Sequence, residues 1–318
     1  MNARSFPDLA TLRASGKVGL ARALAKLERG AGSLEAAELL DAAEAEPHGD
    51  VLGLTGPPGV GKSTLTGALV RAFRAQGRTV GVVAVDPSSM RSGGALLGDR
   101  ARIPTDPDDR GVFVRSLAAR DRLGGLSELA FGAVLLMRAL FDRVIVETVG
   151  VGQSEADVAL VADTILLAVQ PASGDALQFI KAGVMELPDV MAVTKADLGL
   201  PAIRAREDLE GAMALTNPGT GRWRAPVTLV ASETGEGLDT LVALIEEHAV
   251  FLREGGLRER RRAERSEARL RAGLRTKFGT VGLAACAAVL PGLSGGPFAR
   301  EAEATRILSA RLRGDGAA

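Results

Sequence analysis

The sequence has few of the residues that form disulfides or hold transition metals. Its 318 residues include one cysteine, two histidines, one tryptophan and no tyrosine. A single cysteine cannot form an internal disulfide, so the composition gives no indication of an oxidising compartment. One thiol and two imidazoles also leave few ligands for a dedicated zinc, nickel or iron site.

Long hydrophobic runs and an excess of one charge are missing as well. The first 30 residues mix charged with apolar side chains, unlike a signal peptide. The longest apolar stretch near the end, residues 281–290, has about half of the ~20 residues that a membrane helix needs. The 39 basic residues balance 39 acidic ones, so the basic excess of a nucleic-acid binder is absent. We therefore expect a soluble, cytoplasmic protein without a membrane or nucleic-acid partner.

Between residues 51 and 250, short runs rich in β-branched residues alternate with longer amphipathic segments. The runs are mostly apolar on both sides, which is typical of parallel strands covered on both faces. The amphipathic segments between them predict crossover helices. This pattern indicates an α/β fold with a doubly wound, mainly parallel sheet. The expected strands are residues 51–55, 79–85, 112–115, 143–147, 164–169, 190–194 and 227–231.

Helical sequence flanks this domain on both sides. Leucines at helical spacing precede it, and Ser33 is placed to cap a helix over residues 34–45. The sequence after the domain is first rich in Arg and Glu and ends in a helical segment over residues 301–313. We therefore expect three parts: an N-terminal helical extension over 1–50, the α/β domain over 51–250 and a C-terminal helical arm over 251–318.

A glycine-rich motif directly follows the first predicted strand and opens a helical segment. It fits the pattern G-x-x-x-x-G-K-[ST] of a phosphate-binding loop. Glycines let backbone amides approach phosphate oxygens, and the helix N-terminus favours their negative charge. The lysine places a cation on the β- and γ-phosphates, and the serine hydroxyl is a Mg²⁺ ligand. The predicted nucleotide-binding residues here are Gly56, Pro57, Pro58, Gly59, Val60, Gly61, Lys62, Ser63 and Thr64.

Acidic residues end two of the predicted strands. Asp86 closes the second run, Glu147 closes the fourth, and Asp99 lies in the glycine-rich stretch after Asp86. Because ligands bind at the carboxyl ends of strands in α/β sheets, we predict that these acids join Ser63 around Mg²⁺ or its waters. The alternative is that each acid only caps the next element. Several glycines predict loops that rearrange with the γ-phosphate, at positions 93, 94, 98, 150 and 152.

The sixth run ends in Thr194-Lys195-Ala196-Asp197, which fits the [NT]-K-x-D pattern of guanine recognition. The aspartate accepts hydrogen bonds from guanine N1–H and its exocyclic amine, and the lysine stem covers the ring. Adenine lacks these donors, so the motif predicts a preference for GTP and GDP. After the seventh run, Ser232, Glu233 and Thr234 are placed to offer a backbone amide to guanine O6. The alternative for both segments is an ordinary surface loop.

Further motifs lie in the same region. The string Glu147-Thr-Val-Gly-Val-Gly-Gln-Ser-Glu155 is the most specific of them. Others are Asp86-Pro-Ser-Ser89, Gly93-Gly94, Leu97-Gly-Asp-Arg100, Arg115-Ser116, Gly124-Gly125, and Gly174-Asp175 with Leu177, Gln178, Lys181 and Gly183. Together these motifs resemble the MeaB/ArgK family of P-loop GTPases, which accompany methylmalonyl-CoA mutase. The resemblance is close over about residues 50–250.

The resemblance implies a GTP-hydrolysing chaperone of a B12-dependent acyl-CoA mutase, with methylmalonyl-CoA mutase as the first choice. Such a protein gates adenosylcobalamin loading and protects the mutase. The resemblance also implies that the loops at 86–99, 148–155 and 171–182 report the nucleotide state, and that the C-terminal arm forms a homodimer. We expect Lys62 and Glu147 to act in catalysis. Gln153 is a candidate for orienting the attacking water, with a purely structural loop role as the alternative.

The chain departs from the family at one site residue, because Thr194 stands where the family usually has Asn. Threonine occurs at this position in other GTPases, so we expect the preference for GTP to remain. Two alternative functions stay open. One is a metal-insertion GTPase of the same superfamily, although the chain has no C-x-C-C or His-rich tract. The other is a P-loop kinase that acts on a transport protein.

Overall fold

The computed structural model describes residues 6–30, 32–87, 103, 105–106, 108–119, 127–148, 158–171, 187–215 and 223–313. The chain divides into two compact units. One unit is residues 48–258, and the other combines residues 1–47 with residues 259–318. The middle of the chain thus forms one unit, and its two flanking segments share the other.

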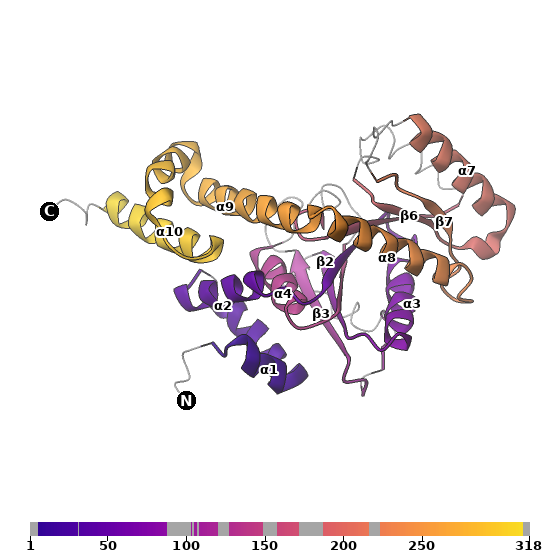
Figure 1. Ribbon diagram of the computed structural model, residues 1–318, viewed down its shortest axis with the longest axis horizontal. Helices are drawn as coiled ribbons and strands as arrows, with labels where there is room; N and C mark the ends of the chain where they lie inside the picture. The colour runs from indigo at the N-terminus through magenta and orange to yellow at the C-terminus, as the bar shows by residue number, and fades with distance from the viewer. Residues whose placement is uncertain are drawn as a thin grey trace. The chain divides into compact units, whose positions relative to one another are not determined.

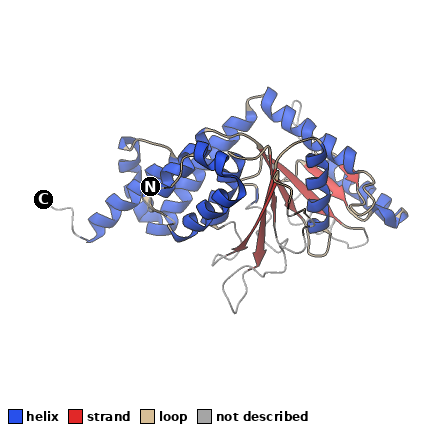
Figure 2. Ribbon diagram, turned by 90° about the horizontal axis from the view of Figure 1, so that it is seen from below, coloured by secondary structure: helices blue, strands red, loops and turns tan. Residues whose placement is uncertain are grey.

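Residues 48–258 are built around a seven-stranded sheet in which all strands run parallel (Figure 2). The strand order is β3-β2-β4-β1-β5-β6-β7, so β1 lies in the centre between β4 and β5. All seven apolar runs form strands, which confirms the predicted α/β fold. The strands are β1 (Asp50–Thr55), β2 (Val80–Pro87), β3 (Val112–Ala119), β4 (Arg143–Glu147), β5 (Thr164–Val169), β6 (Val190–Val193) and β7 (Val227–Leu229).

Helices cover both faces of this sheet (Figure 1). α3 and α8 pack against each other and against one face. α7 packs against β6 and β7 on the opposite face. α4 also covers that opposite face, where Met137 lies against Gly81 of β2. These helices are α3 (Lys62–Ala75), α4 (Glu128–Arg138), α7 (Leu200–Leu215) and α8 (Leu238–Glu254), and a 3₁₀ turn, η2 (Ala196–Leu198), precedes α7.

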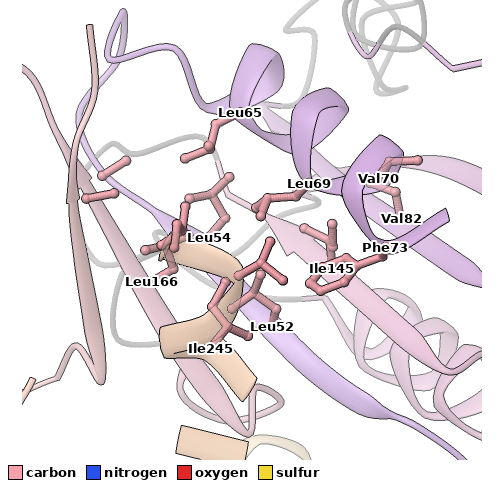
Figure 3. Packing of buried hydrophobic residues seen from close by; sticks show 14 of the residues in the cluster. Leu52, Leu54, Leu65, Leu69, Val70, Phe73, Val82, Ile145, Leu166 and Ile245 are labelled. Carbon is pink, nitrogen blue, oxygen red and sulfur yellow. The ribbon is translucent and has the colours of Figure 1, made fainter. Parts of the chain in front are cut away.

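The main apolar core lies between the sheet and the helices α3 and α8 (Figure 3). Leu65 and Leu69 of α3 pack over Leu54 of β1, and Ile245 enters from α8. Alternate residues of the strands face the other way. On β5, Leu166 and Ala168 join this core, whereas Leu167 and Val169 join the cluster under α7. Both faces of the strand are therefore buried, as its continuous apolar run predicts.

Four strand ends differ from the predicted ones near the carboxyl edge, including those of β3, which extends to Ala119, and β6, which ends at Val193. β2 extends to Pro87, because its last residues pair with the end of β3. Asp86 is therefore the second-last residue of a strand. β7 ends at Leu229, because Ala231 forms an antiparallel bridge with Glu236 instead of continuing the parallel ladder.

In the other unit, helices from both ends of the chain pack together. α1 packs against α2, and α2 packs against α10. The Ser33 hydroxyl caps α2 as predicted, accepting the amide of Ala36 at 3.2 Å. Asp41 on α2 accepts the amides of Phe298 and Ala299, in the first turn of α10, at 2.9 and 2.8 Å. These helices are α1 (Leu9–Arg29), α2 (Leu34–Ala45) and α10 (Pro297–Arg313).

α9 (Leu257–Val289) begins at the end of the first unit and continues through the second. Gly279 interrupts it with φ +69°, a conformation that favours glycine. Within the second unit, Glu301 of α10 is buried and pairs with two cations of α9, Arg269 at 2.7 Å and Lys277 at 2.9 Å. Among the helices that the structure describes, none combines the length and apolar character needed to span a membrane.

Candidate nucleotide site

The predicted phosphate loop joins β1 to α3 at the carboxyl edge of the sheet. Gly56 follows β1 with φ +144°, and a Cβ at this position would lie 2.2 Å from the carbonyl oxygen of Ala168 on β5. Gly61 precedes α3 with φ +95°, in the left-handed region. The loop can therefore turn sharply from strand to helix only with glycine at these two positions. Gly61 supplies no side-chain cap to the α3 N-terminus, so the helix presents its amides and its dipole to the loop.

Lys62 is the first residue of α3, and its side chain folds back over the loop. Its ammonium donates to the carbonyl oxygens of Gly56 and Pro57 at 2.7 and 2.9 Å. The side chain is 7% exposed, so the cation is held close to the place where the loop turns. A lysine ammonium has three donors and behaves as a compact point charge. This geometry keeps the cation beside the loop that is predicted to hold phosphates.

Glu147 lies at the end of β4, directly behind the loop. One carboxylate oxygen accepts the Ser63 hydroxyl at 2.6 Å, and the other accepts the Thr66 hydroxyl at 2.9 Å. Glu147 is 8% exposed and Thr66 is fully buried. The structure thus brings together Ser63 and Glu147, which the sequence predicted to share one ion.

The chemistry of this pair suits magnesium. Serine hydroxyl and carboxylate oxygens are hard ligands, and Mg²⁺ prefers oxygen to nitrogen or sulfur. Mg²⁺ also keeps several waters and takes phosphate oxygens, so one or two protein ligands suffice. Ser63 and Glu147 are therefore a donor set that fits Mg²⁺ bound together with a nucleotide.

The Thr194 and Lys195 side chains connect the predicted guanine motif to the phosphate loop. The Thr194 hydroxyl lies 2.8 Å from the carbonyl oxygen of Val60 in the loop, and it is buried. Lys195 has a left-handed backbone, with φ +54°, and its ammonium donates to the carbonyl oxygen of Gly59 at 3.1 Å and to Gln170 Oε1 at 2.7 Å. Two loops that are far apart in the sequence are thereby held side by side.

Asp197 lies in the 3₁₀ turn η2 and is exposed. Its carboxylate is therefore accessible to a base. The loop after β7 contacts the turn that holds Asp197, since the amide of Ala196 donates to the carbonyl oxygen of Val230 at 3.2 Å. In that loop the Thr234 hydroxyl bonds within the turn, to the carbonyl oxygen of Ala231 at 3.4 Å. Ser232 and Glu233, the other two predicted residues of this loop, lie in the turn between Ala231 and Thr234.

Some predicted site residues lie outside the residues that the structure describes. Asp99 and Gln153 are among them, as are most of the three predicted nucleotide-sensing loops. The backbone of Asp86 is described within β2, and its side chain is not. The roles of these residues therefore stay predictions from the sequence.

Two further polar residues contact the site, and the sequence analysis did not select them. Thr66 holds Glu147, and Gln170 holds Lys195. For Thr66 a signal existed, because it stands three residues after Ser63 on a helix and so shares its face. Gln170 follows β5 at the carboxyl edge, but its partner depends on how β5 and β6 are aligned.

A phosphate loop after a buried central strand, a hydroxyl–carboxylate pair behind it and an adjoining T-K-x-D loop define a class: a P-loop protein that binds guanine nucleotides. Comparison with known proteins then identifies the family. Residues 20–280 match the family described as methylmalonyl Co-A mutase-associated GTPase MeaB, and the chain belongs to it. The chain is therefore a GTPase of the family that the sequence motifs resemble.

Relatives agree with this assignment. A protein of Pyrococcus horikoshii named as a GTPase is 45% identical over 221 residues, which are 68% of this chain and 69% of that protein. The mouse protein named methylmalonic aciduria type A homolog, mitochondrial, is 39% identical over 190 residues, or 59% of this chain and 46% of the mouse protein.

Solved structures show the same architecture. A protein described as a LAO/AO transport system kinase superposes with a TM-score of 0.68 at 27% identity, covering 96% of each chain. HypB of Helicobacter pylori, solved with nickel, superposes with a TM-score of 0.50 at 21% identity, covering 67% of this chain and 93% of that one. Because the HypB protein is only 21% identical to this chain, the likeness shows a shared fold and nothing more.

Proposed function

We propose that this GTPase is a chaperone of an adenosylcobalamin-dependent acyl-CoA mutase, with methylmalonyl-CoA mutase as the partner. In this proposal it gates cofactor loading and protects the mutase from inactivation. The observation that carries the proposal is membership of a family described as mutase-associated. The relatives named for methylmalonic aciduria support the same partner.

Different residues of the site would bind the phosphates and the base of the nucleotide. The Lys62 ammonium would exchange the carbonyls of Gly56 and Pro57 for β- and γ-phosphate oxygens, which are stronger acceptors because they are charged. Asp197 would accept the N1–H and the exocyclic amine of guanine, with the Lys195 stem over the ring. The backbone amides of residues 232–234 would face guanine O6.

Ser63 and Glu147 would hold Mg²⁺ or its waters, and Asp86 and Asp99 would complete its surroundings. When bound, the ion would supply positive charge that neutralises the charge developing on the phosphate oxygens during transfer. Gln153 would orient the attacking water.

A reconstitution experiment tests the proposal. GTP hydrolysis by the purified protein is measured alone and with purified methylmalonyl-CoA mutase, and transfer of adenosylcobalamin to the mutase is followed by absorbance. We expect slow hydrolysis that accelerates with the mutase, and cofactor transfer that depends on whether GTP or GDP is bound. Absence of both complex formation and acceleration, under either nucleotide, would contradict the proposal.

The kinase alternative has one observation in its favour, the name of the transport-system protein that superposes over the whole chain. The same hydrolysis assay separates the two activities if it uses γ-labelled GTP. A GTPase releases the label as inorganic phosphate, whereas a kinase transfers it to a protein. Label that stays on a protein acceptor would favour the kinase.

The proposal includes a homodimer formed through the C-terminal arm, residues 251–318. The end of α9 supports it, since Val281 after the Gly279 kink is 86% exposed. Light scattering of the full chain and of a Val281→Asp variant tests this part. We expect a dimer for the first and a shift toward monomer for the second.

A further inference from the structure

The backbone of Glu147 is held by strand pairing, whereas the position of its carboxylate depends on side-chain torsions. In the central sheet it lies in register with Leu54 of β1 and with Ala84 of β2, so neighbouring strands hold its main chain on both sides. The amide of the next residue, Thr148, donates to the carbonyl oxygen of Leu54 at 3.1 Å. The remaining freedom lies in the three side-chain torsions of the glutamate, which decide where its two oxygens point.

Two hydroxyls on α3 hold these oxygens. Ser63 binds Oε1 at 2.6 Å, and Thr66 binds Oε2 at 2.9 Å. Ser63 belongs to the phosphate loop and would itself contact Mg²⁺ under the proposed function. Thr66 lies one turn further along the helix, is fully buried and belongs to no phosphate-binding motif.

We propose that Thr66 is a positioning residue, whose hydroxyl holds Glu147 Oε2 so that Oε1 stays directed at Ser63 and the phosphate loop. This inference rests on the proposed role of Glu147 and Ser63 in holding Mg²⁺. A hydroxyl that donates to a carboxylate forms a charge-assisted bond, which is stronger than a neutral one. Without it, a buried carboxylate oxygen loses the Thr66 donor and the side chain is held less firmly.

Threonine suits this position better than other hydroxyl residues. Its β-branch restricts χ1 in a helix, so the hydroxyl has few directions open to it. The surroundings are fully buried, so water cannot replace the donor without entering the core. Valine at this position keeps the shape and the rotamer preference and removes only the hydrogen bond.

The test compares Thr66→Val with Thr66→Ser, and uses Thr305→Val as a matched control. Thr305 is also helical and partly buried, and its hydroxyl donates to a backbone carbonyl of α10 at 2.7 Å. Binding of a fluorescent GDP analogue is titrated with MgCl₂ and repeated in EDTA. Circular dichroism establishes that each variant is folded at the temperature of the assay.

We expect Thr66→Val to raise the Mg²⁺ concentration for half-maximal effect by about tenfold, the loss expected for one hydrogen bond to a charged group. Nucleotide affinity in EDTA should stay within about twofold, because the phosphate loop itself is unchanged. Thr66→Ser should restore most of the Mg²⁺ response, and Thr305→Val should not alter it. If Thr66→Val does not fold, Thr66→Ala takes its place with the same expected shift.

Two outcomes would overturn the inference alone. One is a folded Thr66→Val or Thr66→Ala protein that titrates with Mg²⁺ like the unsubstituted protein. The other is a Thr66→Ser protein as impaired as Thr66→Val, because the hydroxyl that serine retains would then fail to support the Mg²⁺ response. Failure of the proposed magnesium site has a different signature, because the unsubstituted protein would then bind GDP equally well in MgCl₂ and in EDTA, and both proposals would fall.

Discussion

The two edges of the central sheet use different interactions. At the amino edge, an aspartate stands just before each of three strands. Its carboxylate accepts a backbone amide from the start of the neighbouring strand or from the residue just before that strand. The three bonds are Thr79 N to Asp142 at 2.7 Å, Val51 N to Asp163 at 2.8 Å and Ile165 N to Asp189 at 2.9 Å. Each bond joins the starts of adjacent strands, so this edge is fastened by the chain's own side chains.

An ion network adds to the amino edge. Arg143 opens β4 and is almost fully buried between Asp50 at 2.7 Å and Glu246 at 2.5 Å. Arg78 also pairs with Glu246, and Arg258 pairs with Asp50. The network ties the start of β1 and β4 to α8 and to the first residues of α9.

At the carboxyl edge, the corresponding side chains are held by hydroxyls and main-chain carbonyls. Lys62 donates to loop carbonyls, Thr194 bonds to another, and Glu147 accepts two hydroxyls. A nucleotide with its metal ion can replace such partners, whereas nothing in the proposed reaction replaces the aspartates of the amino edge. We therefore expect substitutions at the amino edge to change the free energy of unfolding, and substitutions at the carboxyl edge to change nucleotide binding.

The largest effect should come from Lys62→Ala. We expect GTP affinity to fall about a thousandfold, or ~4 kcal/mol, because the phosphates lose their buried cation. The free energy of unfolding without nucleotide should fall by less, about 1–3 kcal/mol, because the ammonium also donates to the carbonyls of Gly56 and Pro57. Calorimetry of GTP binding and urea unfolding measure the two quantities. Unchanged GTP affinity would mean that the predicted phosphate loop does not bind the nucleotide.

The opposite pattern is expected for Arg143→Met at the amino edge. Losing one partner of a buried ion network should lower the free energy of unfolding by ~3 kcal/mol. GTP affinity of the folded variant should stay within about twofold of the original. The control is Arg206→Met, because Arg206 is 38% exposed and lies 3.6 Å from Glu210, so its loss should cost less than ~0.5 kcal/mol. Weakened GTP binding by folded Arg143→Met would show that the two edges are coupled.

A third substitution, Asp197→Asn, sharpens the comparison within the carboxyl edge. An amide cannot accept both guanine donors, so the preference for GTP over ATP should fall about tenfold or more. Stability should not change measurably, because Asp197 is exposed. Competition of GTP and ATP against a fluorescent guanine nucleotide measures the preference. If the preference persists, another part of the protein reads the base.

The smallest effect concerns pH at the amino edge. Burial alone would raise the pKa of Asp142, but the hydrogen bonds from the Thr79 hydroxyl and amide and from His48 outweigh it and lower the pKa. A lowered pKa contributes stability above the ordinary pKa of aspartate, and this contribution is lost as the pH falls through the folded value. Asp142→Asn should thus be less stable at pH 7 by less than ~1 kcal/mol, since the carboxylate is partly exposed.

Urea unfolding at pH 7 and at about pH 3 measures this difference, because the second value lies below the ordinary aspartate pKa. The stability difference between the unsubstituted protein and Asp142→Asn should be smaller at the acid pH, because the contribution of the carboxylate declines below the ordinary pKa and vanishes only below the folded value. A difference that stays constant over this range would mean that the carboxylate charge plays no part in the bond to Thr79.

The sequence predicts the architecture well because the signals are local. Runs such as 144–146 are β-branched and apolar, which is the pattern of a strand buried on both faces. The meeting of Ser63 with Glu147 also follows from local signals, since Ser63 ends the phosphate-loop motif after one strand and Glu147 closes another. The boundaries are less predictable, because β2 gains its last residues by pairing with β3.

The sequence does not predict the interactions that depend on alignment between distant segments. Asp163 and Val51 are 112 positions apart, and their bond requires β5 to lie beside β1 in one register. From the sequence alone, an aspartate before a strand cannot be told from an ordinary turn residue. For Thr66 the sequence holds a local signal, its place three residues after Ser63, but its partner Glu147 on β4 lies 81 positions away.

The bonds from Asp41 to the start of α10 affect the order in which the chain can fold during synthesis. Asp41 and its partner Phe298 are 257 positions apart, and the whole GTPase unit lies between them. Ribosomes add ~5–20 residues each second, so α2 waits tens of seconds for this partner. The GTPase unit leaves the ribosome complete before the helical unit can close. The first helices of the chain are therefore made early and reach their final packing last.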